Sequence, residues 1–178
     1  YEQFQNGLET LEKEGMTALV VDLRDNPGGN LDTVCQILDL LLPEGTIVYT
    51  EDKNGERVDT KTSDDEHQFT KPLAVLVNGR SASASEVFSG AVQDYGTGTI
   101  IGTQTYGKGI VQTLYSLSDG SCLKLTTAQY FTPDGRNIHG EGITPDIVVE
   151  KSADDQTDNQ LEKAVETVQN AVDGTEKE

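Results

Sequence analysis

Apolar residues follow two patterns that alternate along the chain, namely continuous runs and repeats at helical spacing. The continuous runs are TALVVDL (17–23), PLAVLVN (72–78) and TIIG (99–102). These short runs, rich in branched residues, predict strands, the first two of them buried. The helical repeats predict a helix near the N-terminus, a second capped by Asn30, a third after Ser83 and a fourth near the C-terminus. Strands that alternate with helices are typical of an α/β fold.

The rest of the pattern predicts strands that are not all parallel. Asn54-Gly55 is a typical hairpin turn and lies within the polar-apolar stretch TIVYTEDKNGERVDTKT. Two more strands span 109–132 around an SDGS turn, and IVVE (147–150) predicts a last short strand. We therefore expect a single domain, with an α/β core over about residues 1–150 in which helices flank a mixed β-sheet.

The C-terminal segment predicts a helix over residues 157–172. Thr157 and Gln160 form the pattern of a capping box at its start. One side of this helix is apolar and carries Leu161, Ala164, Val165, Val168 and Val172. Residues 173–178 are expected to fray.

Composition and charge narrow the range of partners. The 178 residues include 31 Asp and Glu against 13 Lys and Arg, a formal net charge of −18. A surface this acidic repels phosphate backbones and anionic lipid, which disfavours charge-driven binding to nucleic acid or to a membrane surface. The chain shows no membrane-length apolar run and no signal-peptide pattern. It begins with Tyr1 in what reads as a helix already under way, so we expect a fragment whose compartment these absences do not decide.

The two cysteines, Cys35 and Cys122, have neither the spacing of a metal site nor that of a disulfide framework. Both lie in apolar segments, which predicts buried and inert thiols. Their spacing leaves open whether they approach each other. We expect neither a metal nor a cofactor.

The stretch GRSASASEVFSGAVQDYG (79–96) places Ser81, Ser83 and Ser85 at every second position before an apolar helix. Serines cap helices, which is one explanation of this row. The other explanation is that one of them is a nucleophile, which then needs a base within hydrogen-bond reach. The order of the residues does not decide between the two.

Two types of residue offer such a base. His67 lies in the acidic stretch SDDEHQ (63–68), where a surface histidine is expected, and His139 lies in a polar loop without a carboxylate signature. Lys108 stands between two glycines in TYGKGIVQ, which let its backbone approach another segment closely. Burial can lower the pKa of a lysine by up to ~3–5 units and keep the amine neutral, although a solvated turn is the plainer explanation of this pattern.

The same segment also fits the start of a phosphate-binding loop, GTQTYGKG. Gly109 stands where such a loop has Ser or Thr, and strand-like residues follow where a helix is needed. We therefore reject a nucleotide site there.

Three segments taken in order, DLRDNPGG, VNGRSASASE and TYGKGIVQ, resemble the motifs of the C-terminal processing peptidases, also called tail-specific proteases. The resemblance extends from the first strand through GEGITPDIVV, which is most of the chain. It implies a ClpP/crotonase-like core and a serine endopeptidase that cuts polypeptides, typically near their C-termini, through an acyl-enzyme. It also implies a location outside the bacterial cytoplasm, membrane-anchored or secreted in the full-length protein.

The resemblance gives roles to particular positions of this sequence. It implies that Ser83 is the nucleophile and Lys108 the general base, a Ser-Lys dyad, with Gln112 orienting the lysine amine. A carbonyl oxygen on Gln112 would accept from the amine without adding a charge. The implied oxyanion hole consists of two backbone N–H groups, one from Ala84 and the other from either Gly28 or Gly29.

Family members normally carry a PDZ domain before this region, and we expect this chain to begin after it. The implied partners are polypeptide substrates and that PDZ domain, and a homo-oligomer is left open. A catalytically silent peptide-binding module on the same fold is the alternative function. An acyl-CoA enzyme of the crotonase type is disfavoured by the acidic charge and by the peptidase motifs. With Lys108 as the base, activity should rise with pH and depend on neither histidine.

Overall fold

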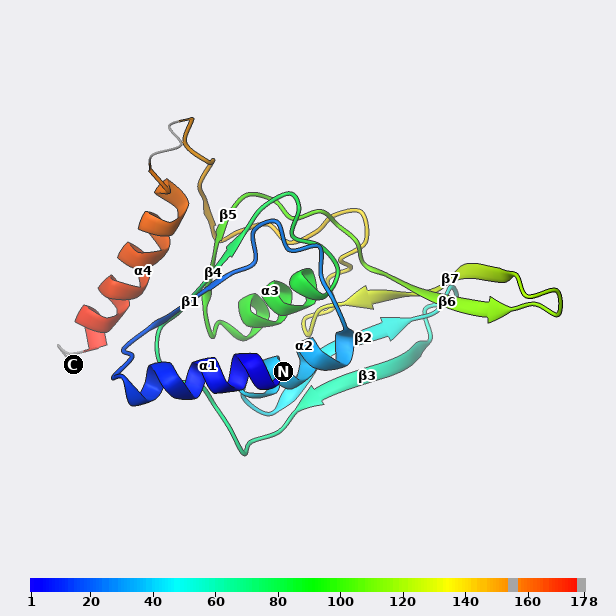
Figure 1. The fold of residues 1–178 in the computed structure, drawn as a ribbon, viewed down its shortest axis with the longest axis horizontal. Helices are drawn as coiled ribbons and strands as arrows, with labels where there is room; N and C mark the ends of the chain where they lie inside the picture. The colour runs from blue at the N-terminus through cyan, green and yellow to red at the C-terminus, as the bar shows by residue number, and fades with distance from the viewer. Residues whose placement is uncertain (154–156, 176–178) are drawn as a thin grey trace.

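The computed structural model describes residues 1–153 and 157–175, which form two four-stranded β-sheets and the helices around them (Figure 1). The first sheet is parallel throughout and has the strand order β1-β4-β5-β8. Its strands are β1 (Leu19–Asp22), β4 (Leu73–Val77), β5 (Thr99–Gly102) and β8 (Ile147–Val148). Val75 of β4 pairs with Val21 of β1 on one side and with Ile100 of β5 on the other.

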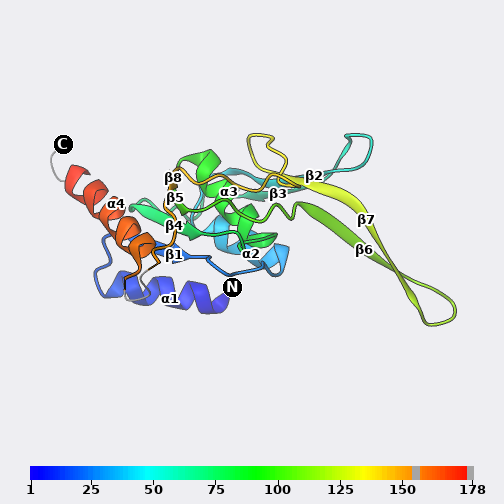
Figure 2. The same ribbon diagram turned by 90° about the horizontal axis from the view of Figure 1, so that it is seen from above.

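The second sheet is antiparallel and has the order β3-β2-β7-β6. Its strands are β2 (Gly45–Glu51), β3 (Arg57–Ser63), β6 (Ile110–Ser116) and β7 (Cys122–Phe131). The predicted hairpin at Asn54-Gly55 joins β2 to β3, and the β6–β7 hairpin extends away from the rest of the molecule (Figure 2). The predicted α/β class with parallel and antiparallel strands is confirmed, and the two kinds of strand occupy separate sheets.

Helices cover the sheets and fill the space between them. They are α1 (Glu2–Lys13), α2 (Leu31–Asp39), α3 (Ala84–Tyr95) and α4 (Asn159–Thr175). Asn30 caps α2 as predicted, because its side chain accepts the backbone N–H of Thr33 at 2.9 Å. Over the described ranges, no helix combines the length and the apolar character needed to cross a bilayer.

Strand β4 lies at the centre of the core. All five of its side chains are buried. Leu73, Val75 and Val77 belong to a large apolar cluster with α2 and α3, whereas Ala74 and Leu76 pack with α4 on the opposite face. A parallel strand buried on both faces reads as a continuous apolar run, which is why the sequence predicted it correctly.

Strand β1 has a similar apolar run but is less buried than predicted. It forms the edge of the parallel sheet, and its three apolar residues are only partly buried. An edge strand has a neighbour on one side only, so its composition overstates its burial. The strand predicted over 17–23 is therefore confirmed at 19–22, whereas the prediction that it is buried is wrong.

The start of α4 also differs from the prediction. Asp158 caps this helix, because its Oδ1 accepts the backbone N–H of Leu161 at 3.1 Å. The side chain of Gln160 is instead buried and donates to the carbonyl of Val149 at 2.7 Å. The capping box of Thr157 and Gln160 is therefore wrong.

The buried side of α4 is narrower than its apolar residues suggest. Ala164 and Val168 are buried against the parallel sheet, whereas Leu161 and Val165 are exposed. The helix extends to Thr175, so residues 173–175 are helical where fraying was predicted. The rest of that predicted tail, 176–178, lies outside the described residues.

Arg24 connects the loop after β1 to the start of α4. Its guanidinium donates to both carboxylate oxygens of Asp158, at 2.7 and 2.8 Å, and to Asp22 at 2.6 Å. The hydrogen bonds from Arg24 lower the pKa of Asp158 to about 2. These charges therefore hold two segments together that are far apart in the sequence.

The two cysteines lie in different environments. Cys35 is buried as predicted, and this burial raises the pKa of its thiol to about 11. Cys122 is exposed, contrary to the prediction, because it begins β7 in the projecting hairpin, where no second layer covers the strands. The two thiols are free and do not pair.

Candidate active site

Ser83 has a strained backbone at the sharp turn between β4 and α3. Its φ of 58° and ψ of −117° put a residue with a side chain into the positive-φ region. Such strain costs on the order of 1–3 kcal/mol and persists only where the surrounding structure imposes it. A serine on a sharp strand-to-helix turn exposes its hydroxyl, which is the geometry of a nucleophile elbow.

The flanking serines, Ser81 and Ser85, have structural roles. Ser81 is fully buried, and its hydroxyl donates to the carbonyl of Leu23 at 2.7 Å. Ser85 is also buried and donates to the carbonyl of Asn26 at 3.1 Å. Ser83 is the partly exposed member of the row, so solvent and substrate reach only its side chain among the three.

The buried carboxylate of Glu86 organises the surroundings of Ser83. One oxygen, Oε1, accepts from the Thr105 hydroxyl and from the backbone N–H of Gly107, both at 2.6 Å. The other, Oε2, accepts the backbone N–H groups of Ser83 and Lys108, both at 2.8 Å. Four donors on a fully buried carboxylate fix the first turn of α3 against the loop that carries Lys108.

This shared oxygen brings Ser83 and Lys108 together although 25 positions separate them in the sequence. Each of their backbone nitrogens lies 2.8 Å from Glu86 Oε2, so the two nitrogens are no more than twice that distance, 5.6 Å, apart. A lysine side chain that starts this close to a serine can reach its hydroxyl. The candidate nucleophile and the candidate base are therefore neighbours.

Gly109, the residue after Lys108, allows the backbone to approach the Ile138–His139 segment closely. The sequence predicted such a close approach for the glycines that flank Lys108. A Cβ at this position would lie 2.8 Å from the carbonyl carbon of Ile138, a distance that real Cβ atoms essentially never show. The loop around Lys108 is therefore packed against the segment that carries His139.

The lysine side chain itself does not meet the expectation of burial. Lys108 is exposed and borders an open depression together with Pro27, Ala82 and Tyr106. Within the described residues, no hydrogen bond joins its amine to Ser83 or to Gln112. The prediction of a buried amine is wrong for this structure, because the tight loop buries the backbone on either side of the lysine and leaves its side chain outside.

Gln112 lies on β6, four residues after Lys108, and its side chain is exposed. A register shift between Val111 and Gln112 interrupts the pairing with β7 at this point. Such irregularities re-aim side chains and are common beside active sites. The structure thus places Gln112 near the start of the strand that follows the candidate base.

Gly28 packs directly against the turn of Ser83. Its φ is +100°, and a Cβ at this position would lie 2.6 Å from the carbonyl oxygen of Ala82 and 2.9 Å from the nitrogen of Ala84. A side chain at position 28 would therefore collide with the backbone on both sides of Ser83. The glycine turn after β1 and the nucleophile turn fit together only because residue 28 is a glycine.

The N–H groups around this contact differ in availability. Gly28 already donates to the Asn26 side chain at 3.0 Å. Among the residues described, neither Gly29 nor Ala84 donates its N–H to a protein acceptor. Ala84 is also the first residue of α3, where the helix dipole favours negative charge. Of the three predicted oxyanion residues, Gly29 and Ala84 have the free donors.

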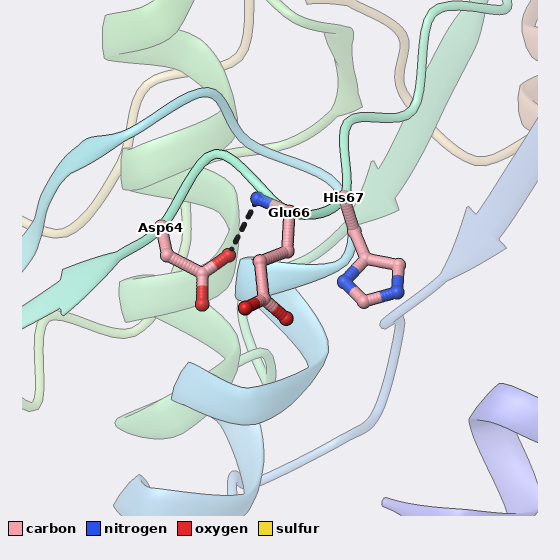
Figure 3. A group of neighbouring side chains, drawn as sticks. All are labelled: Asp64, Glu66 and His67. Carbon is pink, nitrogen blue, oxygen red and sulfur yellow. Dashed lines mark hydrogen bonds between the residues drawn. The ribbon is translucent and has the colours of Figure 1, made fainter.

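The two histidines lie outside this arrangement. His139 is exposed and follows Ile138 in the loop, and His67 is exposed between β3 and β4. Figure 3 shows His67 beside Asp64 and Glu66, three side chains whose ligating atoms lie within 4.8 Å of one another. Asp64 also accepts the backbone N–H of Glu66 at 2.9 Å, as a solvated acidic turn does. The prediction of a solvated loop over 63–68 is confirmed for residues 64–68, which are exposed, whereas Ser63 is buried at the end of β3.

Sequence reasoning missed the central position of Glu86. The spacing Ser83-x-x-Glu86 is the pattern of a capping box, and Glu86 does accept the N–H of Ser83 as such a box requires. That signal could have identified the contact to Ser83. It carried no information on Thr105, Gly107 or Lys108, because those donors come from a loop 19 to 22 residues away.

Comparison with known proteins identifies the family. The model of peptidase family S41 matches residues 1–149. The chain belongs to peptidase family S41. Curated relatives include the carboxyl-terminal-processing protease of Synechocystis sp., 44% identical over 151 residues, which are 85% of this chain and 35% of that protein. The carboxy-terminal-processing protease of Bartonella bacilliformis is 51% identical over 135 residues, 74% of this chain and 31% of that protein.

The solved structures extend this S41 assignment to the fold. The photosystem II D1 C-terminal processing protease matches with a TM-score of 0.78 and 39% identity, over 82% of this chain and 38% of that one. The resemblance to C-terminal processing peptidases and the ClpP/crotonase-like core are thereby confirmed. This S41 chain spans about a third of the length of the relatives named here.

Proposed function

We propose that this S41 chain is the catalytic core of a serine endopeptidase that cleaves polypeptides near their C-termini. Family membership and the names of the curated relatives support this activity. The observation that carries the proposal is the Glu86 carboxylate, whose Oε2 accepts the N–H groups of both Ser83 and Lys108. Those contacts bring a strained, accessible serine and a lysine within reach of each other.

In the proposed mechanism Ser83 and Lys108 act as nucleophile and base. The Oγ of Ser83 attacks the scissile carbonyl carbon while its proton passes to the nitrogen lone pair of the Lys108 amine. The protonated amine then gives this proton to the leaving nitrogen, and the C–N bond breaks to leave an ester on Ser83. The same amine then takes a proton from a water molecule, whose oxygen attacks the ester carbonyl carbon. The amine returns this proton to the Oγ of Ser83 as the Oγ–C bond breaks and the acid product leaves.

Because the Lys108 side chain is exposed, the proposal requires the bound substrate to shield it from water. A polypeptide bound over the depression of Pro27, Ala82 and Tyr106 covers the lysine side chain and excludes water from it. Water exclusion disfavours the charged form of an amine and strengthens hydrogen bonds around it. Gln112 then accepts from the amine through its side-chain carbonyl and directs it toward Ser83.

The negative charge that develops on the carbonyl oxygen needs preorganised donors. Gly29 and Ala84 supply the two N–H groups that the surrounding protein leaves free. Such donors are commonly the largest contribution to acyl transfer, and loss of one typically costs ~10²–10³ in kcat. Gly28 serves the same hole by letting the two turns approach.

The alternative is a catalytically silent peptide-binding module on the same fold. The exposure of the Lys108 side chain, without a hydrogen bond to Ser83 in the described structure, favours this reading. In that case the same surfaces bind a peptide but the serine hydroxyl is not activated. The two functions differ in one measurable property, the reactivity of Ser83.

A fluorophosphonate probe, which reacts only with an activated serine, tests the proposal. We expect one adduct by intact mass, located at Ser83 by peptide mapping, and none in the Ser83→Ala variant. Lys108→Ala should slow labelling at least ~100-fold, the usual contribution of a general base. Ser116→Ala and Lys124→Ala are the matched controls, because they remove a serine and a lysine side chain from the exposed β6–β7 hairpin. Both variants should be labelled like the parent chain.

Equal labelling of the Ser83→Ala variant would reject the assigned nucleophile. Normal labelling of Lys108→Ala together with loss in His139→Ala would replace the lysine by a histidine as the base. Peptide binding without labelling of the parent chain would establish the silent module.

The resemblance also supports the wider setting of this activity. We propose that the full-length protein carries a PDZ domain that captures substrates, as other family members do. Whether the full-length protein forms a homo-oligomer stays open. The proposed site of action is outside the bacterial cytoplasm.

A further inference from the structure

The open depression beside the candidate base, here called the Lys108 depression, has a volume of about 490 Å³. Pockets that hold small ligands measure ~300–1,000 Å³. The wall carries two cations and one carboxylate, in a chain whose formal net charge is −18. It is formed by Asp25, Pro27, Arg80, Ala82, Tyr106 and Lys108. The depression is therefore a local exception to the acidic character of the molecule.

The proposed mechanism determines which part of the substrate occupies the Lys108 depression. The protonated amine of Lys108 gives its proton to the leaving nitrogen, so this nitrogen lies within hydrogen-bond reach of the amine. The scissile carbonyl oxygen lies instead at the N–H groups of Gly29 and Ala84, which are not part of the wall. The residues that follow the scissile bond, the leaving segment, therefore lie in the depression, where Arg80 is the second cation.

Asn78 holds Arg80 and Asp25 together in this wall. Its Oδ1 accepts the backbone N–H groups of Arg80 at 2.9 Å and of Asp25 at 3.1 Å, and its Nδ2 donates to Asp25 Oδ1 at 3.2 Å. Asp25 has a φ of 59°, and in the described ranges it shares a positive φ with one other non-glycine residue, Ser83. Strained backbone of this kind clusters at active sites and ligand-binding turns.

The guanidinium of Arg80 is available to a ligand. Its five N–H donors make a single contact among the described residues, from Nη1 to Asp25 Oδ1 at 3.4 Å. Charge-assisted hydrogen bonds are normally ~2.7–2.9 Å long, so this contact is a weak one. The Arg80 side chain is 82% exposed, and a carboxylate that pairs with its planar fork through two hydrogen bonds binds better than Asp25 does.

We infer that Arg80 binds a carboxylate on the leaving segment, two residues beyond the scissile bond. This inference rests on the proposed peptidase function. Two extended residues span at most ~7 Å, which a depression of this volume accommodates. The carboxylate is either the free C-terminus of the polypeptide or an acidic side chain, since both offer two oxygens to the guanidinium. The core itself therefore distinguishes leaving segments by their charge.

Acyl transfer tests this inference, because an amine that attacks the acyl-enzyme enters along the path by which the leaving nitrogen departs. p-Nitrophenyl acetate first acetylates Ser83 and releases p-nitrophenolate. The amine of a dipeptide then attacks the ester carbonyl carbon and loses a proton to Lys108, which returns it to the Oγ of Ser83 as the Oγ–C bond breaks. The measured quantity is the ratio of acetylated dipeptide to acetate, after subtraction of the Ser83→Ala background.

Two pairs of dipeptides identify the source of the carboxylate. Ala-Gly and its amide differ in the terminal carboxylate, whereas Ala-Asp-amide and Ala-Asn-amide differ in a side-chain carboxylate. We expect the acidic member of at least one pair to be acetylated ~5-fold more than its neutral partner, at the upper end of what exposed ion pairs provide. Addition of about 1 M NaCl, which shortens the screening length to ~3 Å, should reduce this preference.

Two variants should change the preference in opposite directions. Arg80→Gln should abolish it, whereas Asp25→Asn removes the competing carboxylate and should raise it about twofold. Asparagine tolerates a positive φ, so the turn at position 25 is kept. Arg57→Gln removes an exposed guanidinium from β3, outside the depression, and should keep the preference of the parent chain. A fluorophosphonate without a peptide reports in each variant whether Ser83 is still reactive.

An unchanged preference in Arg80→Gln overturns the inference. So does a parallel loss of fluorophosphonate labelling in this variant, since Arg80 would then support Ser83 itself rather than bind the leaving segment. Labelling of the parent chain at Ser83 without preference within either pair of dipeptides rejects the role of Arg80 alone. If the parent chain neither reacts with the fluorophosphonate nor hydrolyses the ester, the proposed function fails and this inference fails with it.

Discussion

At the scale of single residues, Glu86 connects more of the candidate site than either proposed catalytic residue. Its two oxygens accept from four donors on two segments. A glutamine at this position has one oxygen and one NH₂ group. One pair of donors, either Thr105 and Gly107 or Ser83 and Lys108, would then face the NH₂ group, which is itself a donor. In either orientation of the amide, at least one buried backbone N–H group is left without an acceptor.

Glu86→Gln should therefore damage both stability and the reactivity of Ser83. Buried unpaired donors cost ~1–3 kcal/mol each, so we expect the free energy of unfolding to fall on the order of 2–4 kcal/mol in a urea titration. Fluorophosphonate labelling of Ser83 should slow at least ~10-fold, because the turn loses the contact that holds it to the Lys108 loop.

Glu66→Gln is the matched control, since it removes a carboxylate from an exposed turn. It should change neither quantity. Wild-type labelling and stability in Glu86→Gln would show that the four hydrogen bonds contribute nothing to the site.

The same scale shows what the sequence could not reveal about the site. The row of serines and its resemblance to a peptidase motif selected Ser83, and the strained backbone of that residue agrees with the choice. The pattern alone favoured a solvated Lys108, and the resemblance required a buried one, because glycines on both sides of a lysine are compatible with a buried amine and with an exposed one. The side-chain direction depends on backbone contacts to Glu86 that are distant in sequence.

At the scale of elements, α4 depends on charge as well as on apolar packing. Its buried face is short, with Ala164 and Val168 at the sheet, and Arg24 clamps its first turn through Asp158. The pKa of Asp158 is lowered to about 2 by this contact, against ~3.9 for an unperturbed aspartate. The ion pair therefore adds stability above about pH 4 and loses this contribution as the pH falls through 2.

We expect Asp158→Asn to unfold more easily than the parent chain at pH 7, as measured by urea titration. The carboxylate is partly exposed and screened by water, so the difference should be no more than ~1 kcal/mol. It should shrink as the pH falls below 4. Asp65→Asn, which removes one charge from an exposed loop, should not show this pH dependence, and a difference that grows in acid would contradict the role given to Arg24.

The elements also show where apolar patterns predict structure and where they fail. The run at β4 gave a strand buried on both faces, because helices cover both sides of it. Strand β1 has a similar composition but is only partly buried, and the strand that begins at Cys122 is exposed there. A run of apolar residues records the propensity for a strand, whereas its burial depends on which other segments cover it.

At the scale of the whole molecule, the net charge of −18 opposes the compact state. Thirty-one acidic residues share one small surface, and only 13 basic residues offset them. Folding brings the excess carboxylates closer together than in the unfolded chain, so their mutual repulsion lowers the free energy of unfolding. Most ion pairs of the described structure are solvent-exposed, and such pairs contribute little. Repulsion should therefore dominate the response to salt.

Raising NaCl from 10 to 150 mM shortens the screening length from ~30 to ~8 Å and should raise the melting temperature of this chain. If the free energy of unfolding rises on the order of 1 kcal/mol, the melting temperature of a protein of this size rises by ~2–4 °C in a calorimetric scan. KCl at equal ionic strength should give the same shift, since screening does not distinguish the two cations.

A lower melting temperature in salt would show that attractive ion pairs outweigh the repulsion. A larger shift with CaCl₂ at matched ionic strength would instead indicate specific cation binding, for which the Asp64, Glu66 and His67 group is the structural candidate.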